Sequence, residues 1–430
     1  MTRMHDLLGV GIGPFNLGLA ALADAVADLD ARFLEREPEF RWHPGLLLDG
    51  TRLQVPFLAD LVTLVDPTSR WSFLAYLRDR ERLYPFYFAE RFHVPRREYD
   101  DYCRWAAHAL PSCTFGADVQ AISWDARARA FDVHARTADG PQRLLARNVV
   151  LGIGTAPWVP AALRPLLDDR AVHAAHYRDH RDRLLATADV TVVGSGQSGA
   201  EVFLDLLRAV PADTRLRWLT RTPALAPMEY SKLGLEHFTP AFTEYFRALT
   251  PDVRTAVLPR QWQLYKAISA DTIADIHEAL YERTIGGGWP DEIDLRPCTA
   301  VEAAAPDGDG VLLRCHEQRQ DRRFDVRTDA VVLATGYAPR EPACLAPLAG
   351  QLARAEGGAL SVDGSYRVAL TPEVEGRLYV QNAELHTHGV GAPDLGLGAH
   401  RSAAILNDLA GRTIYPLPRR TAFTSFGAPA

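Results

Sequence analysis

Cysteine, long apolar runs and clustered positive charge are all scarce in this sequence. The five cysteines among its 430 residues are scattered, and no two have the C-x-x-C spacing of a redox or metal site. Isolated cysteines are typical of free thiols in a reducing compartment. We therefore expect a cytoplasmic protein without disulfides.

Several classes of protein are excluded by further absences. No stretch of 18 or more apolar residues is present, and the first residues, MTRMHDLLGVGIG, lack the charged and apolar regions of a signal peptide. The net charge is −7 and no basic stripe stands out, so neither a membrane nor nucleic acid is an expected partner. The chain also lacks a G-x-S-x-G elbow and any Ser/His/Asp arrangement for acyl transfer.

A strand, glycine turn, helix, strand pattern occurs twice in the chain. In residues 6–34, DLLGVGIG is an apolar run with a glycine turn, FNLGLAALADAVAD has helical periodicity, and ARFLERE returns as a strand. Residues 189–221 repeat the pattern. The sequence therefore predicts an α/β fold with two Rossmann-like dinucleotide-binding domains.

Two further segments indicate how these domains are connected. NVVLGIGTAPWVP (148–160) and DAVVLATGYAPR (329–340) each read as a strand that ends in a glycine-containing turn. We expect a discontinuous first domain of residues 1–185 and 330–430, with the second domain, residues 186–329, inserted in it. A small helical region within the second domain, at about 235–285, is expected to contribute to a substrate pocket.

The first glycine motif is GVGIGPFN (9–16), with Gly11 and Gly13 in G-x-G and Asn16 where a third glycine often stands. The first glycine permits a tight turn, and the second lets backbone amides approach a pyrophosphate at a helix N-terminus. Glu35 ends the next strand, where an acidic residue takes a ribose hydroxyl. A helix turn without a ligand is the alternative, and Glu35 disfavours it.

The second motif, GSGQSGAE (194–201), is a complete G-x-G-x-x-G, and the strand after it ends in Thr220 and Arg221 without an acidic residue. Arg221 can pair with a 2′-phosphate that a carboxylate would repel, which favours NADPH over NADH. A solvated loop charge is the alternative for Arg221. Two dinucleotide sites in one chain are typical of FAD with NADPH, between which hydride is transferred.

Two histidines raise the question of a metal site. His386 and His388 in LHTHG (385–389) would point the same way on a strand. No third ligand stands at a metal-binding spacing from them, so no metal is expected.

Five stretches carry a resemblance to a known family. They are MHDLLGVGIGPFNLGLAAL, WHPGLLLDGTRLQVPFLADLVTLVDPTSRWSFLAYL, VVGSGQSGAEVF, ATGY and NAELHTHGVGAPDLGLGAHRSAAILN. Together they resemble the flavin-dependent N-hydroxylating monooxygenases, which are the lysine, ornithine and diamine N-monooxygenases of hydroxamate siderophore synthesis. The likeness runs in order from residue 5 to about 426.

The resemblance implies FAD and NADPH as cofactors, and a primary amine and O2 as substrates. NADPH reduces the flavin, O2 adds to form a C4a-hydroperoxyflavin, and a neutral amine attacks the distal oxygen. Gln54, which matches a family Gln near the flavin and NADP+, is the candidate catalytic residue. The expected cofactor-binding residues are Gly11, Gly13, Pro14, Asn16, Glu35, Trp42, His43, Gln54 and Leu397 for FAD, Gly194, Gly196, Gln197, Ser198, Gly199 and Arg221 for NADPH, and Thr335, Gly336 and Tyr337 of ATGY.

Two residues that differ from the family's usual ones indicate which substrate is bound. The apolar stretch RLQVPFLADLVTLVDPTS (52–69) matches the channel where flavin and amine meet. Amino-acid hydroxylases usually have a Lys, paired with the substrate carboxylate, where this chain has Ala59, and the ornithine enzymes have Asn where Leu235 stands. Burial of a carboxylate without its cation is costly, so a diamine such as putrescine or cadaverine is expected. The alternative is that Lys232 or Lys266 replaces the missing cation.

We therefore predict an FAD- and NADPH-dependent N-monooxygenase that acts on putrescine or cadaverine for hydroxamate siderophore synthesis. The alternative is an L-lysine N6- or L-ornithine N5-monooxygenase. A disulfide or quinone reductase would need a redox-active cysteine pair, and no partner motif favours a flavin-binding sensor. The resemblance implies a homotetramer or a homodimer.

Overall fold

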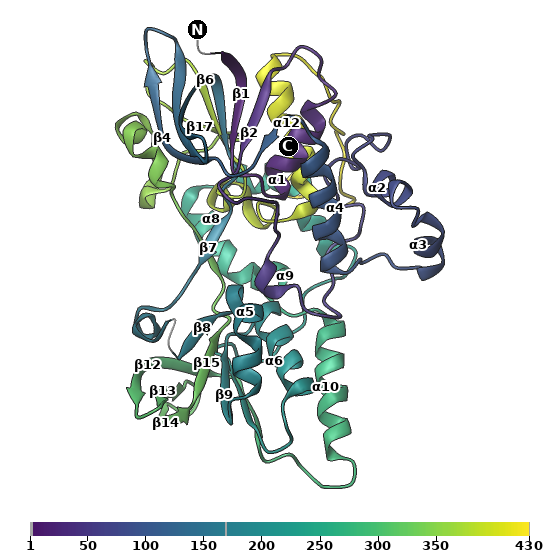
Figure 1. Ribbon diagram of the computed structural model, residues 1–430, viewed down its shortest axis with the longest axis vertical. Coiled ribbons are helices and arrows are strands. Elements are labelled where there is room, and N and C mark those ends of the chain that lie inside the picture. The colour runs from purple at the N-terminus through teal and green to yellow at the C-terminus, as the bar shows by residue number, and fades with distance from the viewer. Residues whose placement is uncertain (1–2, 168–169, 430) are drawn as a thin grey trace.

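Two largely parallel sheets, one in each half of the molecule, organise the fold (Figure 1). The computed structural model describes residues 3–167 and 170–429. In the first sheet the strand order is β17-β18-β6-β1-β2-β3, and β5 and β4 continue antiparallel from β6. Its strands are β1 (Met4–Val10), β2 (Ala31–Leu34), β3 (Cys113–Thr114), β4 (Asp118–Asp125), β5 (Ala130–Thr137), β6 (Gly140–Leu151), β17 (Arg367–Val368) and β18 (Arg377–Val380).

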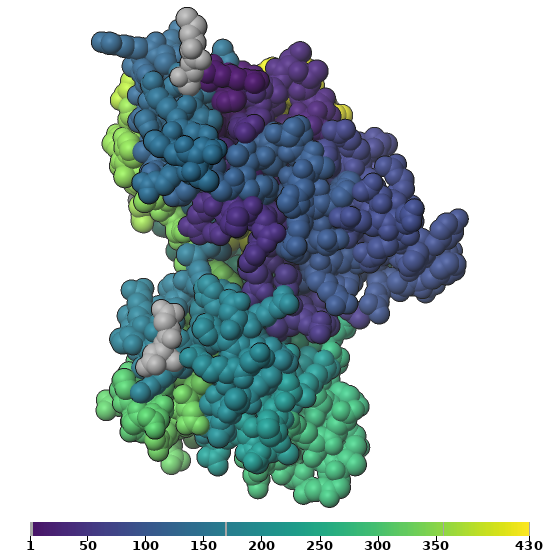
Figure 2. Space-filling view, viewed as in Figure 1, coloured from purple at the N-terminus to yellow at the C-terminus, as the bar shows by residue number. Residues whose placement is uncertain are grey.

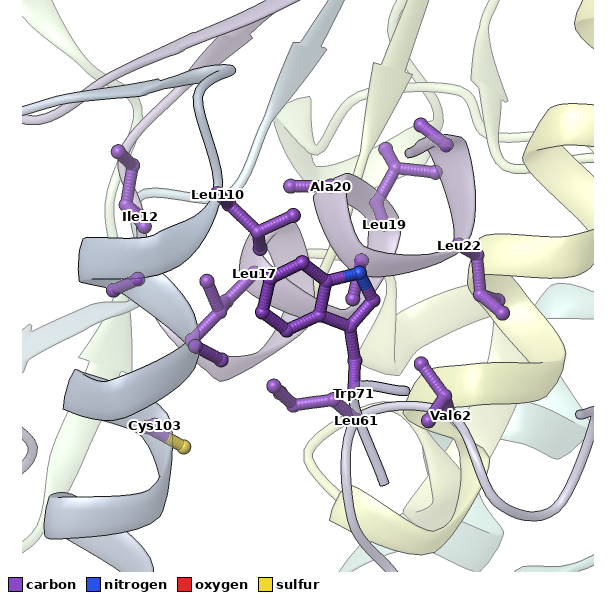
Figure 3. Packing of buried hydrophobic residues seen from close by; sticks show 14 of the residues in the cluster. Ile12, Leu17, Leu19, Ala20, Leu22, Leu61, Val62, Trp71, Cys103 and Leu110 are labelled. Atoms are coloured by element: carbon purple, nitrogen blue, oxygen red, sulfur yellow. The ribbon is translucent and has the colours of Figure 1, made fainter. Parts of the chain in front are cut away.

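The core of the first half surrounds α1 (Pro14–Ala23), which is almost completely buried. Leu17 and Ala20 of this helix lie close to the ring of Trp71, with Leu61 on one side and Leu110 on the other (Figure 3). Full burial of one such side chain stabilises the fold by about 1.5–3 kcal/mol. Leu61 thereby attaches the segment 52–69 to the helix that follows the first glycine turn.

Four further helices belong to this half: α2 (Phe73–Asp79), α3 (Leu83–Ala89), α4 (Arg96–Ala109) and α12 (Gly398–Ala410). α12 packs against α1, and a Cβ on Gly398 would lie 3.3 Å from the Phe15 ring, so the two helices begin at neighbouring places. α3 projects from the rest of the molecule (Figure 1), and none of its residues is buried.

The second sheet has the order β11-β10-β9-β15-β8, and every pair in it is parallel. Its strands are β8 (Ala171–His173), β9 (Asp189–Val193), β10 (Arg215–Leu219), β11 (Ile293–Arg296) and β15 (Ala330–Leu333). Helices α5 (Tyr177–Leu185), α6 (Gln197–Ala209) and α10 (Ala270–Thr284) accompany it. The sheet takes β8 from before residue 186 and β15 from after residue 329, so it extends beyond the expected boundaries on both sides.

The two halves are connected by two crossing segments. β7 (Thr155–Pro157) leaves the first half, β16 (Tyr337–Pro339) returns to it, and the two pair antiparallel. A separate antiparallel sheet consists of β12 (Thr299–Asp307), β13 (Gly310–Glu317) and β14 (Arg322–Thr328). The space-filling view shows the surface hollowed at this waist (Figure 2). The α/β class and the insertion of one dinucleotide fold into another are thus confirmed.

The predicted helical region divides between the two halves. It contains η4 (Gly234–Phe238), α7 (Pro240–Ala248), α8 (Pro251–Val257), η5 (Leu258–Gln261), α9 (Trp262–Tyr265) and α10. α10 packs on α6 and covers the second sheet, whereas α7 contacts the turn α11 (Leu385–His388) and η8 (Gly389–Gly391) of the first half. The C-terminal segment holds this region from outside, because Phe423 N and Thr424 N both donate to Glu236, each at 2.8 Å.

The segment LHTHG is a helical turn and not the strand considered above. His386 Nε2 lies 2.8 Å from the carbonyl of Leu360, and His388 stacks on Tyr366 with ring centroids 4.6 Å apart. In the part of the chain that the structure describes, no three His, Cys, Asp or Glu side chains gather as metal ligands, and no helix has the length and apolar character needed to cross a bilayer. All five cysteines are unpaired.

Shorter turns complete the chain. They are η1 (Pro44–Leu46), η2 (Ala161–Leu166), η3 (Ala174–His176), η6 (Ala343–Gln351), η7 (Glu356–Gly358) and η9 (Leu395–Leu397).

Candidate active site

The first glycine turn has room for a pyrophosphate. Gly11 has a φ of +85°, and a Cβ there would lie 2.7 Å from the Gly152 carbonyl oxygen, so only glycine fits. Gly13 is the N-cap of α1, no side chain caps this helix, and a Cβ on Gly13 would meet nothing closer than 3.9 Å. Pro14 occupies the first turn, where a missing N–H is no loss. The free amides and the open space fit the pyrophosphate of a dinucleotide.

Asn16 and Glu35 hold this turn in place. Asn16 is fully buried, and its Nδ2 donates to the carbonyls of Gly11 at 2.8 Å and Val10 at 3.2 Å. Its Oδ1 accepts from Gln381 at 2.7 Å, so the side chain is turned inward and supports the loop. The Glu35 carboxylate is half-buried and accepts from Ile12 N at 2.8 Å, which places it beside the turn, where the ribose of a bound dinucleotide was expected.

The second glycine turn repeats this construction. Gly194 has a φ of +135°, and a Cβ there would lie 2.1 Å from the Ala334 carbonyl oxygen. Gly199 permits close packing of α6, since its Cβ would lie 2.7 Å from the oxygen of Gly194. Gly196 is the N-cap of α6 without a capping side chain, and the half-buried Ser198 follows in the first turn. This helix end therefore also presents free amides.

Gln197 and Arg221 differ in their surroundings. The Gln197 Oε1 accepts from Ser269 N at 2.7 Å, and its Nε2 donates to Glu201 at 2.8 Å and to Thr272 at 2.9 Å. Gln197 thus ties the glycine turn to α10. Arg221 is exposed just beyond the carboxyl end of β10, the strand that neighbours β9 in the sheet. It lies where the 2′-phosphate of NADPH was expected.

An aromatic row crosses from the first half to the second. Successive ring centroids of Tyr99, Trp42, His43, Tyr337 and His173 lie 5.0, 5.1, 5.7 and 5.4 Å apart. Removal from bulk water, assisted by the charge of Arg96, lowers the pKa of His43 to about 4, so its imidazole is neutral. His43 is nevertheless accessible to solvent, as expected for the wall of a cleft.

The ATGY stretch (334–337) leads from β15 into β16, where the chain returns to the first half. Gly336 has a φ of +89°, and its carbonyl accepts from Trp158 N at 2.9 Å. Thr335 Oγ1 donates to the carbonyl of the same Trp158 at 2.5 Å. These bonds, together with the β7–β16 pair, fix Tyr337 beside His43. Burial raises the pKa of Tyr337 to about 12, so its hydroxyl stays protonated.

Gln54 has a donor without a partner. Its Nε2 is buried and has no hydrogen-bond partner among the described residues. Its backbone oxygen accepts from the Tyr230 hydroxyl at 2.9 Å. An unsatisfied buried donor costs about 1–3 kcal/mol, and a bound ligand would remove that cost. The side chain therefore fits the expected position beside a cofactor.

The residue predicted to mark the substrate lies next to the turn η9. Ala59 is 5% exposed. A Cβ on Gly396 would lie 3.9 Å from Ala59 Cβ and 2.8 Å from Asp394 Oδ1. Leu397, in the same turn, is buried and is the N-cap of α12. We call Gln54, Ala59, Tyr230, Asp394 and Gly396 the Ala59 cluster.

The other residues considered for the substrate, Leu235, Lys232 and Lys266, lie at the surface. Leu235 is 38% exposed, and Lys232 and Lys266 are both exposed. The Lys266 Nζ lies 5.1 Å from the centroid of the Tyr265 ring, and its backbone oxygen would lie 3.1 Å from a Cβ on Gly196. The backbone of Lys266 thus contacts the second glycine turn, while its ammonium rests on a neighbouring ring.

Three functional candidates were not identified from the sequence. Tyr230 is far from Gln54 along the chain and bonds to it only in the fold, and the charge of the still more distant Asp394 reaches Tyr230. Arg96 of α4 forms an ion pair with Glu201 of α6 at 2.7 Å. The spacing of these residues carries no recognisable motif, so only the tertiary structure reveals them.

The fold and the site define the class of protein. Two glycine turns lie at the carboxyl ends of parallel strands, in two nested domains, with an aromatic row between the halves. This construction is that of an oxidoreductase that moves hydride between two dinucleotides.

Comparison with known proteins identifies the family. The sequence model described as L-lysine 6-monooxygenase/L-ornithine 5-monooxygenase matches residues 3–339, and the chain belongs to this family. The rhizobactin siderophore biosynthesis protein RhbE of Rhizobium meliloti is 44% identical, over 99% of this chain and 95% of that protein. Putrescine N-hydroxylase of Shewanella oneidensis is 40% identical, over 98% of this chain and 84% of that protein.

A solved structure is similarly close. The FAD-bound cadaverine monooxygenase of Erwinia amylovora superposes with a TM-score of 0.96 at 36% identity, covering 100% of this chain and 99% of that one. The chain is an N-hydroxylating flavin monooxygenase of the siderophore-biosynthesis type, and its cofactors are FAD and NADPH.

Proposed function

We propose that this enzyme N-hydroxylates one primary amine of an aliphatic diamine, putrescine or cadaverine, and so supplies a hydroxamate siderophore pathway. The observation that carries the proposal is Ala59, a buried, small apolar residue at the position where the amino-acid hydroxylases usually have a Lys. A substrate carboxylate placed there would lose water without gaining a partner. The named activities of the putrescine and cadaverine relatives support this choice.

The proposed site assignments follow the two glycine turns. Gly11, Gly13 and Glu35 would hold FAD, whereas Gly194, Gly196 and Arg221 would hold NADPH. Reduced by NADPH, bound FAD supplies the electrons that activate O2 for insertion of oxygen into an N–H bond. The oxygen-activation route described above for the family is part of this proposal.

The chain's own residues would position the reactants and exclude water. Gln54 would donate its free Nε2 hydrogens to a cofactor or to the reacting oxygen, while the Tyr230 bond fixes its backbone. Trp42, His43 and Tyr337 would cover the gap between the halves with neutral side chains. A dry site protects the activated oxygen from release as peroxide.

The alternative, an amino-acid substrate, requires a substitute cation. Lys266 keeps its ammonium over Tyr265, and Lys232 is exposed. A substrate panel distinguishes the two functions. N-hydroxylated product per NADPH consumed should be high with putrescine or cadaverine and low with ornithine and lysine. The reverse order would refute the diamine proposal and direct attention to these two lysines.

A matched pair of variants tests the role of Ala59. Ala59→Lys should lower diamine kcat/KM by about tenfold or more, since like charges repel, and should improve ornithine or lysine slightly. Adding Leu235→Asn should raise amino-acid turnover further, and the two effects should couple because they act on the same substrate. Ala59→Met introduces a long side chain without a charge, so it separates the effect of bulk from the effect of charge. If Met and Lys reduce diamine turnover equally, charge is not the discriminator.

A further inference from the structure

Asp394 is an acidic residue of the Ala59 cluster that the reaction described so far does not use. A Cβ on Gly396 would lie 2.8 Å from Asp394 Oδ1 and 3.9 Å from Ala59 Cβ, so both side chains approach this glycine. Its charge also acts on Tyr230, whose hydroxyl bonds to Gln54, and contributes to the raised pKa of that tyrosine. Asp394 therefore approaches the same glycine as Ala59, and its charge reaches the tyrosine that bonds to the Gln54 backbone.

Part of this carboxylate has a structural role. Asp394 is the N-cap of η9, and Oδ1 accepts from Gly396 N at 2.7 Å. No Lys, Arg or His of the described residues forms an ion pair with it. Arg401, whose charge reaches Asp394, is paired with Glu384 at 3.0 Å. The carboxylate thus accepts backbone hydrogen bonds from Gly396 and Leu397, and no cationic side chain of the described residues is paired with it.

The surroundings of Asp394 disfavour the ionised form of its carboxyl group. Burial raises the pKa of Asp394 to about 6, although the cap bond and the charge of Arg401 act in the opposite direction. Asp394 as a residue is half-buried, so it keeps part of its surface in contact with solvent. A cationic ligand would offset the cost of keeping this carboxylate ionised.

We propose that Asp394 binds the distal ammonium of the diamine, and so determines specificity at the end of the substrate that is not hydroxylated. The inference rests on the proposed function. An amino-acid substrate would bring its carboxylate to this region, where Asp394 would repel it, whereas a diamine brings the cation that Asp394 lacks. Ala59 thus leaves space without positive charge, and Asp394 supplies the negative charge.

The test compares Asp394→Asn with the native holoenzyme on two amines of equal length. Asn retains an oxygen that can accept from Gly396 N, but it removes the charge. Putrescine kcat/KM should fall by about tenfold or more, mainly through KM. For 1-aminobutane, which lacks the second ammonium, kcat/KM (or Ki, if it is not turned over) should change by less than about twofold.

Asp394→Glu provides a second and independent measurement. It keeps the charge but moves it toward the reacting end of the site by one methylene. The preference should therefore shift toward putrescine, the shorter diamine, relative to cadaverine.

The outcomes separate this inference from the function on which it rests. If the native enzyme hydroxylates no diamine, the proposed function fails. If it hydroxylates putrescine while Asp394→Asn loses activity equally toward both amines, Asp394 is only a cap and the inference is overturned. An unchanged putrescine KM in Asp394→Asn, or an unchanged chain-length preference in Asp394→Glu, would overturn it as well.

Discussion

At the scale of single residues, charge at a few positions selects the ligands. Arg221 stands exposed at the end of β10, where an enzyme that prefers NADH carries an acidic residue. We propose that Ala59 and Asp394 select the amine substrate, Ala59 because it lacks a positive charge and Asp394 because it carries a negative one. Each of these effects depends on one side chain, so each can be changed without altering the fold.

Arg221→Ala should erode the preference for NADPH over NADH. A hydrogen bond to a charged group contributes about 1.5–3 kcal/mol, so the ratio of the two kcat/KM values should fall by about tenfold or more. The ratio is measured from initial rates of NADPH and NADH oxidation with a saturating amine. Arg215→Ala, at the opposite end of the same strand, removes an equally exposed charge and serves as the control. Equal kcat/KM values for both cofactors in the native enzyme would contradict this role.

At the scale of elements, the two glycine turns are similar in construction and should differ in ligand. Gly13 and Gly196 both precede a helix in an extended backbone conformation, so a larger side chain strains neither backbone. A side chain at Gly13 would occupy open space, and one at Gly196 would approach the Lys266 carbonyl oxygen, 3.1 Å from its Cβ. Substitution should therefore exclude a ligand more than it disturbs folding.

Gly13→Val should yield folded protein without bound flavin, because the added methyl groups occupy the pyrophosphate position. Gly196→Val should retain flavin that NADPH no longer reduces. Flavin absorbance per protein and anaerobic reduction by NADPH measure the two properties. Reduction of the Gly196→Val flavin by dithionite shows that this flavin is still redox-active. Reversed phenotypes would mean that the two nucleotide sites are assigned the wrong way round.

At the scale of the whole molecule, a buried ion pair couples the two halves. Arg96 lies on α4 of the first half and Glu201 on α6 of the second, and their side chains are only 11% and 4% exposed. Glu201 also accepts from Gln197 of the glycine turn. This pair, together with the close approach of Gly45 to the Ala175 carbonyl, therefore connects the second half, including its glycine turn, to the first.

Glu201→Gln should weaken this coupling, because it leaves the Arg96 guanidinium buried without its anion. Removal of one partner of a buried pair costs about 3–5 kcal/mol, so Tm should fall clearly. Anaerobic flavin reduction by NADPH should slow, and more of the NADPH consumed should yield peroxide. The double variant Arg96→Met/Glu201→Gln should recover Tm without recovering the reduction rate. If it recovers both, the pair stabilises the fold but does not orient the glycine turn.

Much of the fold was readable from the sequence because its signals are local. Each glycine turn is specified by adjacent residues, and the helices after Gly13 and Gly196 begin where the periodicity predicts them, although the first ends at Ala23 and not at Asp28. Domain boundaries were less accurate, because β8 and β15 are assigned to the second sheet only by pairing with each other and with β9. LHTHG was wrongly predicted as a strand, because five residues are too few for their periodicity to separate a strand from a helical turn.

The sequence by itself determined the nested α/β construction, the two dinucleotide motifs and the missing cation at position 59. All of these depend on residues that are close together in the chain or on the identity of one residue. Only the tertiary structure decided that Asn16 accepts a hydrogen bond from Gln381, that Gln54 has a free donor, and that Asp394 and Ala59 both approach Gly396. These facts depend on how segments far apart in the chain pack together, and that packing follows from the complete core and not from any local pattern.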